Sequence, residues 1–181
     1  PGWLHLDYGN PEAARWLLQT PLLNDAAKES LLGQSNRPKL VRMGETVLLI
    51  LRGINHNKDH RPEEMVALRI FITPDLIISS RRRPLLSEQG VFNQLTQGGG
   101  ADTPADWLVE VCDALTDRAG EFVEELHDQI LELEEHVLAR DLPANGRLAR
   151  IRKQLIMIRR YLSPQRDLVA RLANENISCL F

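Results

Sequence analysis

The longest periodic segment of the chain is TPADWLVEVCDALTDRAGEFVEELHDQILELEEHVLAR, residues 103–140. Its apolar residues recur every three or four positions in an eleven-residue repeat of about 3.67 residues per turn, which keeps one stripe on one side of a nearly straight helix. Thr103 can cap this helix, and Pro104 can occupy its first position. We expect a helix about 50 Å long that buries Leu108, Val111, Leu115, Ala119, Phe122, Leu126, Ile130, Leu133 and Val137.

A second helical stripe follows the break DLPANG at residues 141–146. A short loop between long helices makes them antiparallel neighbours. Residues 106–141 contain 12 acidic and two basic side chains, whereas residues 147–171 contain eight basic and one acidic. Opposite charges predict that the two helices pair, although each exposed ion pair contributes only a few tenths of a kcal/mol. The second stripe is Leu148, Ile151, Leu155, Ile158 and Leu162.

The first hundred residues have the pattern of a sheet. Short segments rich in Val, Ile and Leu, several with strict alternation, are separated by turns such as Met43-Gly44-Glu45 and Pro74-Asp75. Adjacent hairpins predict a mixed, largely antiparallel sheet. The expected strands are residues 3–7, 39–42, 46–54, 66–73 and 76–80.

Three shorter helices are expected around these strands. Asn10-Pro11 is typical of a cap and first turn, and the helix after it would bury Trp16, Leu17 and Ala13. A second helix is capped by Asn24 or Asp25 and ends at Gly33. A third spans residues 84–95. The sequence thus predicts an α/β (α+β) fold, with a sheet domain at residues 1–100 and a long antiparallel helical hairpin at residues 101–181.

Composition limits the class of protein. With 181 residues, 43% hydrophobic and 26% charged, the chain fits one globular domain with a sizeable core. The net charge of -3 gives no global basic field. The longest apolar run, residues 47–51, is far shorter than the roughly 20 residues that span a bilayer. Cys112 and Cys179 form neither a disulfide framework nor a zinc-finger spacing, which favours a reducing compartment.

Two features could hold a metal ion. His56, Asp59 and His60 lie in one polar loop, where the His-x3-His spacing could bind Zn²⁺ with a third ligand; the alternative is an ordinary exposed loop. The acidic helix gathers carboxylates on one face, which could attract hard cations such as Mg²⁺ or could be a solvated face balanced by the basic helix. Those carboxylates belong to Asp113, Asp117, Glu121, Glu124, Asp128, Glu132 and Glu135.

Motifs for other functions are missing. The basic run Arg81–Arg83 could bind phosphate, but no aromatic residues are interleaved with it, so a plain connection and no nucleic-acid binding are expected. The sequence has no Gly-rich phosphate loop, no Gly-x-Ser-x-Gly and no His-Glu-x-x-His. We therefore expect a protein that is not an enzyme.

Three stretches carry a resemblance to a known family. WLHLDY at residues 3–8, VCDALTD at residues 111–117 and RKQLIMIRRYLSPQRD at residues 152–167 resemble the cytoplasmic domain of CorA-like metal ion transporters, most closely the zinc-transporting ZntB branch. The third stretch is the most specific, because Arg159-Arg160, Pro164 and Arg166-Asp167 follow a pattern typical of the family's helical hairpin.

The resemblance implies an α/β/α sandwich followed by long helices, in the soluble funnel of a homopentamer that assembles the oligomer and senses or attracts divalent cations. It also implies a stalk helix, two transmembrane helices and a Gly-Met-Asn-like pore signature beyond residue 181. The full-length protein would lie in the cell inner membrane with this domain in the cytoplasm, would transport Zn²⁺ and would require no cofactor. The alternatives are the same architecture in a magnesium transporter, or a free-standing soluble oligomerisation or adaptor module.

Overall fold

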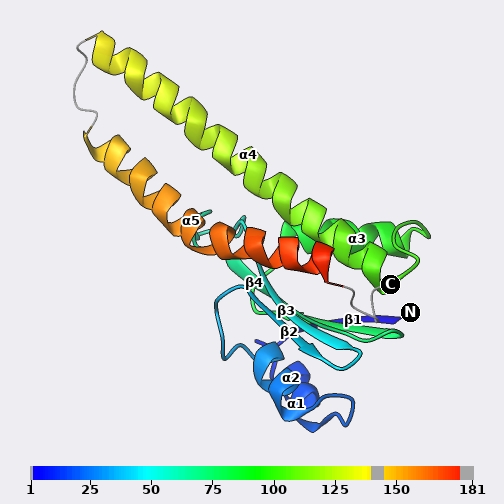
Figure 1. The fold of residues 1–181 in the computed structure, drawn as a ribbon. Coiled ribbons are helices and arrows are strands. Elements are labelled where there is room, and N and C mark those ends of the chain that lie inside the picture. Colours follow the sequence, from blue (N-terminus) through cyan, green and yellow to red (C-terminus); the bar gives the residue numbers. More distant parts are fainter. Residues whose placement is uncertain (1, 140–144, 176–181) are drawn as a thin grey trace.

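The fold is a five-stranded sheet covered by helices on both faces (Figure 1). This computed structural model describes residues 2–139 and 145–175. The strand order is β1-β5-β4-β3-β2; β1 runs parallel to β5, and the other neighbours are antiparallel. The predicted mixed, largely antiparallel sheet is confirmed. The strands are β1 Gly2–Asp7, β2 Lys39–Met43, β3 Thr46–Gly53, β4 Val66–Ile72 and β5 Leu76–Arg81.

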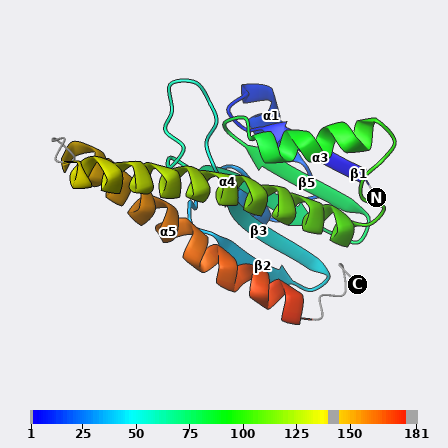
Figure 2. The ribbon, with the colours of Figure 1, turned by 90° about the horizontal axis from the view of Figure 1, so that it is seen from above.

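The helices form two layers. Two short helices cover one face of the sheet, and three helices, including the two longest, cover the other (Figures 1 and 2). This arrangement is the α/β/α sandwich that the family resemblance implied. The helices are α1 Pro11–Gln19, α2 Asp25–Leu31, α3 Leu86–Thr96, α4 Pro104–Leu138 and α5 Asn145–Asn174.

Both faces of β3 are buried. Leu49 and Leu51 belong to the core cluster beneath α4, whereas Leu48 belongs to the cluster beneath α2. Successive side chains of a strand point to opposite faces, and helices cover both faces here, so β3 is apolar almost throughout. The core under α4 also contains Trp107 and Leu168, so the sheet and both long helices share one cluster. The division at residue 100 stays a prediction.

The predicted helix starts are confirmed by their caps. The side-chain oxygens of Asn10, Asn24 and Thr103 each accept a hydrogen bond from a backbone N–H two or three residues later, at 2.9, 2.9 and 3.1 Å. These bonds satisfy donors that have no partner inside the helix. Gly33 follows α2 with φ 98°, a conformation that glycine adopts readily. The third helix begins at Leu86, two residues after the predicted start.

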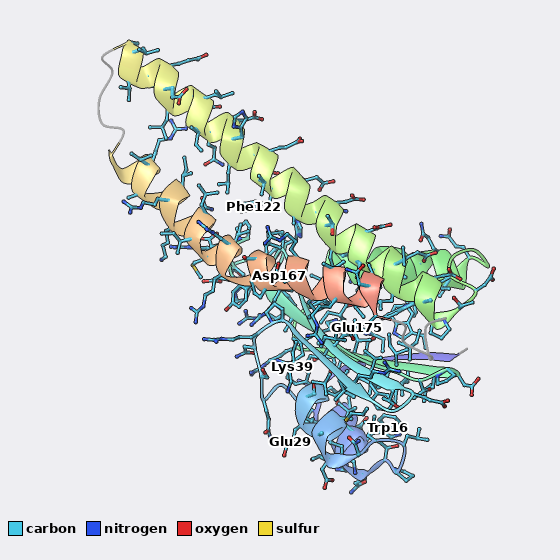
Figure 3. The ribbon with its side chains drawn as sticks, in the orientation of Figure 1. Trp16, Glu29, Lys39, Phe122, Asp167 and Glu175 are labelled. Carbon is cyan, nitrogen blue, oxygen red and sulfur yellow. The ribbon has the colours of Figure 1, made fainter. Side chains whose placement is uncertain are left out.

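The predicted burial of Trp16 is wrong. Leu17 is fully buried, whereas Trp16 remains 37% exposed on the outer side of α1 (Figure 3). A nine-residue helix lying over a sheet turns only a narrow face inward. Leu17 fills that inward face, and its neighbour Trp16 points away from it.

The stripe of α4 is confirmed for most of its length. Phe122 lies between α4 and α5 (Figure 3), in a cluster with Ile151 and Ile158 of α5. Val137, near the end of α4, is 54% exposed. The buried members of the predicted stripe are Leu108, Val111, Leu115, Ala119, Phe122, Leu126 and Leu133.

The stripe of α5 is only half as predicted. Leu148 and Leu155 are 56% and 40% exposed, although Ile151 and Ile158 are buried. Residues seven apart lie almost two full turns apart on one line of a helix. The line of Ile151 and Ile158 continues as Gln165 and Leu172.

The two long helices pair through apolar contacts more than through charge. Among the residues that the structure describes, one ion pair joins α4 to α5: Arg147 Nη2 lies 3.0 Å from Glu132 Oε2. Of the predicted break at residues 141–146, residues 141–144 lie outside the described part of the chain, and residues 145 and 146 already belong to α5. The predicted antiparallel hairpin is therefore confirmed. Apolar contacts, and not the predicted pairing of oppositely charged faces, hold its two helices together.

Candidate functional site

The loop between β3 and β4 is held by asparagine side chains. Asn55 Nδ2 donates to the carbonyl of Glu64 at 2.9 Å, and Asn57 Nδ2 donates to the carbonyl of Pro84 at 2.9 Å. Asp59 has φ 65°, in the left-handed region that aspartate tolerates better than most residues. The loop thus has a defined path at the ends of the two inner strands β3 and β4.

The predicted zinc ligands all lie on this loop with exposed side chains. His60 Nδ1 is 3.4 Å from Glu64 Oε2, while the backbone N–H of Arg61 donates to the same carboxylate and lowers its pKa. Within residues 2–139 and 145–175, no group of three or more His, Cys, Asp or Glu side chains is placed to hold a metal ion. Zinc binding by His56, Asp59 and His60 stays a prediction.

Most acidic residues of α4 are exposed to solvent. All seven carboxylates singled out in the sequence are exposed. Two of them form ion pairs in the described structure, Glu121 with Arg118 at 3.2 Å and Glu132 with Arg147 at 3.0 Å. The remaining carboxylates form a solvated negative face that could attract cations weakly.

A buried polar network joins β1, β5 and α3. Ser79 Oγ lies 2.7 Å from His5 Nδ1 and accepts a hydrogen bond from Trp3 Nε1, also at 2.7 Å. His5 Nε2 lies 2.9 Å from Glu88 Oε1. Arg81 Nε lies 3.4 Å from the other oxygen of Glu88, so the carboxylate is flanked by two basic side chains.

This network is structural, although it combines serine, histidine and a carboxylate. The Ser79 side chain is completely buried, so no substrate can reach its hydroxyl. The sequence analysis missed the grouping because its members are far apart in the chain. The parallel pairing that places His5 opposite Ser79 brings them together.

A second buried site fastens α5 to the sheet. The backbone N–H of Arg52 donates to Gln165 Oε1 at 2.6 Å, and Gln165 Nε2 donates to the carbonyl of Arg52 at 3.0 Å. Strand β2 pairs with β3 only as far as Ile50. Gln165 thus takes the place of the next residue of an edge strand and satisfies backbone groups that would otherwise be buried without partners.

The Arg52 side chain completes this attachment. Its Nε donates to the carbonyl of Asn36 at 2.8 Å and its Nη1 to the carbonyl of Met65 at 2.7 Å. The guanidinium carbon lies 4.4 Å from the centre of the Tyr161 ring, which is close enough for a cation–π interaction. Burial lowers the pKa of Arg52, because desolvation disfavours the charged form.

A groove of about 900 Å³ runs between α4 and α5. Its walls are mainly apolar, and Glu124, Arg159 and Arg166 contribute its charged groups. The groove could accept an apolar surface, but it has no arrangement of groups suited to catalysis. The other lining residues are Leu51, Cys112, Leu115, Thr116, Ala119, Gly120, Val123, Leu155, Ile158, Leu162, Ser163, Gln165 and Val169.

Comparison with known proteins identifies the family. The protein-family model described as "CorA-like Mg2+ transporter protein" matches residues 2–179. The chain belongs to this CorA-like family. It is a family of transporters, which agrees with a fold whose polar clusters are structural.

Curated relatives of this CorA-like chain include zinc transporters. It is 49% identical over 178 residues to the zinc transport protein ZntB of Cronobacter sakazakii, and 48% identical over 177 residues to ZntB of Yersinia enterocolitica. Each alignment covers 98% of this chain and 54% of the relative. The chain therefore spans about half the length of these relatives.

Solved structures share the fold of the CorA-like chain. The full-length CmaX protein is 36% identical, with a TM-score of 0.92 over 98% of this chain and 55% of its own. The ZntB cytoplasmic domain from Vibrio parahaemolyticus is 25% identical, with a TM-score of 0.82 over 97% and 70% of the two chains. The CorA magnesium transporter from Methanocaldococcus jannaschii, at 16% identity and TM-score 0.78 over 96% and 55%, supports the fold alone.

None of the helices described for this CorA-like chain combines the length and apolar character needed to cross a bilayer. The chain matches the cytoplasmic part of a ZntB protein over nearly its whole length. The resemblance found in the sequence is thereby confirmed.

Cys112 in the groove is expected to be unreactive at neutral pH. Burial, with a smaller contribution from Asp113, raises the pKa of its thiol to about 11, so only about one molecule in a thousand carries the reactive thiolate at pH 8. In a Cys179→Ser variant, alkylation by iodoacetamide should be at least about a hundredfold slower than for free cysteine. Mass spectrometry should show the rate still rising between about pH 9 and 10.

The control for this experiment moves the thiol out of the groove. A variant with Val109→Cys in a Cys112→Ala, Cys179→Ser background carries its thiol at a position that is 58% exposed in the native chain. Its alkylation rate should level off near pH 9, as for an ordinary thiol. Equal rates for the two thiols at pH 8 would contradict the burial of Cys112.

Proposed function

We propose that this chain is the cytoplasmic domain of a membrane transporter that moves Zn²⁺. The observation that carries the proposal is the 49% identity with a zinc transport protein over 98% of the chain. At this level of identity across nearly the whole domain, a shared transported ion is the simplest reading. The membrane helices and the ion path belong to the part of the relatives that this chain does not span.

In this proposal the domain forms the soluble funnel of a homopentamer at the inner membrane. Its exposed acidic helix, with Asp113, Asp117 and Glu124 among its carboxylates, would raise the local concentration of divalent cations. A cation that binds one conformation of the funnel better than another would shift the equilibrium between them by that difference in affinity. The domain needs no cofactor for this role.

Zinc transport can be measured with the full-length protein in proteoliposomes that contain a zinc-sensitive dye. Zn²⁺ should enter vesicles that contain the protein well above the rate of protein-free vesicles, because the two curated relatives named above are zinc transport proteins. Vesicles with a magnesium-sensitive dye provide the comparison. Mg²⁺ entry without Zn²⁺ entry would instead identify the protein as a magnesium transporter, the activity named in the description of the family.

The alternative function from a different class of protein is a free-standing adaptor module. It requires a gene that ends near residue 181, whereas a transporter requires an open reading frame that continues into two apolar helices. Absence of both Zn²⁺ and Mg²⁺ flux in the full-length protein would refute the transport proposal.

A further inference from the structure

The first half of α5 carries many exposed basic side chains. Residues 147–160 contain six basic side chains and no acidic one, and all six are exposed. Of these six, only Arg147 forms an ion pair within the described residues. The other five form no ion pair among the described residues, and one of them, Arg159, lines the groove with α4. These five are Arg150, Arg152, Lys153, Arg159 and Arg160.

Apolar side chains stand among these charges. Ile156 and Leu148 are 60% and 56% exposed. A hollow of about 460 Å³ is lined by residues of α5 alone, and it therefore lies away from the groove that α5 forms with α4. Its lining residues are Leu148, Ala149, Arg152, Lys153, Ile156 and Met157.

The fold keeps the acidic residues away from this face. Ile151 and Ile158 turn toward α4, so the hollow lies on the opposite side of α5. On α4 the buried stripe faces α5 and the sheet, while the carboxylates of Asp117, Glu121 and Asp128 are exposed. The hairpin, which extends beyond the sheet (Figure 1), thus has one basic side and one acidic side.

We propose that this basic face of α5, residues 147–160, docks onto the surface of a lipid bilayer that contains anionic phospholipids. Bases beside partly inserted Leu and Ile side chains are the combination with which a helix binds such an interface. Among the described residues, the one ion pair between this face and a carboxylate of α4 joins Arg147 to Glu132, which leaves the charges around the hollow for anionic headgroups. The proposal rests on the proposed function, because a transporter domain lies beside a membrane.

Two other polyanionic partners fit the face less well. Nucleic acid binding would not require exposed isoleucine or leucine among the basic side chains. The lining of the hollow also has no aromatic side chain on which a nucleobase could stack. The acidic α4 of a second copy would meet the charges, but its apolar stripe is already buried in its own core. A bilayer surface offers both anionic headgroups and an apolar layer.

Vesicle sedimentation with the chain of residues 1–181 tests the proposal. The protein should sediment with phosphatidylcholine vesicles that contain phosphatidylglycerol and not with phosphatidylcholine alone. Binding should disappear when ionic strength rises from about 0.1 M to about 1 M, because the Debye length shortens from about 10 Å to about 3 Å. Free inorganic phosphate at the same ionic strength should not displace the protein.

A pair of charge reversals locates the surface. Arg152→Glu with Lys153→Glu should lower the partition coefficient at least about 25-fold, since each base near an anionic surface strengthens binding about fivefold. The matched control is Arg166→Glu with Arg171→Glu, which changes the net charge equally at the sheet end of α5, where these arginines lie beside Asp167 and Glu175. The control pair should change the partition coefficient by no more than about twofold.

Several results would overturn the assignment. These are equal binding to both kinds of vesicle, equal loss of binding with the control pair, displacement by free phosphate, or preferential binding to duplex DNA. Self-association that is lost in the Arg152→Glu, Lys153→Glu variant would instead assign the face to a second copy of the chain. Circular dichroism checks that each variant is folded, and zinc uptake by the full-length protein is measured separately, so either proposal can fail alone.

Discussion

Replacement of Trp107 with alanine is expected to lower the free energy of unfolding by about 4 kcal/mol. The Trp107 side chain is only 2% exposed, and it belongs to the cluster that joins the first turn of α4 to the sheet. Its ring lies edge-on to Trp3 of β1, with the centroids 5.1 Å apart. Urea unfolding followed by circular dichroism measures the change in free energy. In thermal unfolding, the same change should lower Tm by about 8 to 16 °C in a domain of this size.

The Trp107→Phe variant tests how much of this loss comes from the volume of the side chain. The indole Nε1 of Trp107 is buried without a hydrogen-bond partner in the described structure, so phenylalanine loses volume but no hydrogen bond. Its cost should be about 1 to 2 kcal/mol. A loss below about 1 kcal/mol for Trp107→Ala would show that α4 does not depend on this contact with the sheet.

Local signals were enough to predict where the helices begin. The caps Asn10, Asn24 and Thr103 act through side-chain atoms and backbone groups within three residues, so the sequence contains all the atoms involved. The long period of α4 could also be read from the sequence, because its buried residues lie on one line that packs first over the sheet and then against α5.

The choice of buried residues within a stripe was less predictable. Leu155 and Ile158 are equally apolar and both fit a helical period, yet Ile158 is buried whereas Leu155 is 40% exposed. Which line of a helix is buried depends on the position and width of the neighbouring helix, and neither is encoded in the period itself. The same reason explains the exposure of Trp16.

The polar sites were the hardest to predict, because they depend on contacts between distant parts of the chain. His5 and Ser79 are 74 residues apart, and Arg52 and Gln165 are 113 apart. A signal for Gln165 did exist: it occupies the same seven-residue line as Ile151, Ile158 and Leu172. A single polar residue on a buried line indicates a specific partner.

Replacement of Gln165 with alanine is expected to lower the free energy of unfolding by about 3 kcal/mol. The change leaves the N–H and the carbonyl of Arg52 without their bonds of 2.6 and 3.0 Å, and an unpaired buried polar group costs about 1 to 3 kcal/mol. Urea unfolding measures the loss. Hydrogen exchange should also show much weaker protection of the Arg52 amide than in the native chain.

Gln165→Met decides whether the hydrogen bonds or the packing of Gln165 matter. Methionine has nearly the volume of glutamine but cannot pair with a backbone, so it should be within about 1 kcal/mol of the alanine variant. Gln94→Ala on the exposed side of α3 is the matched control and should change the stability by less than about 0.5 kcal/mol. If methionine instead restored native stability, the bonds to Arg52 would be incidental and apolar packing alone would hold α5. Loss of stability in both variants would show that the hydrogen bonds matter. Gln165 would then continue the pairing of β3 beyond the end of β2, and this attachment would fix the hairpin relative to the sheet.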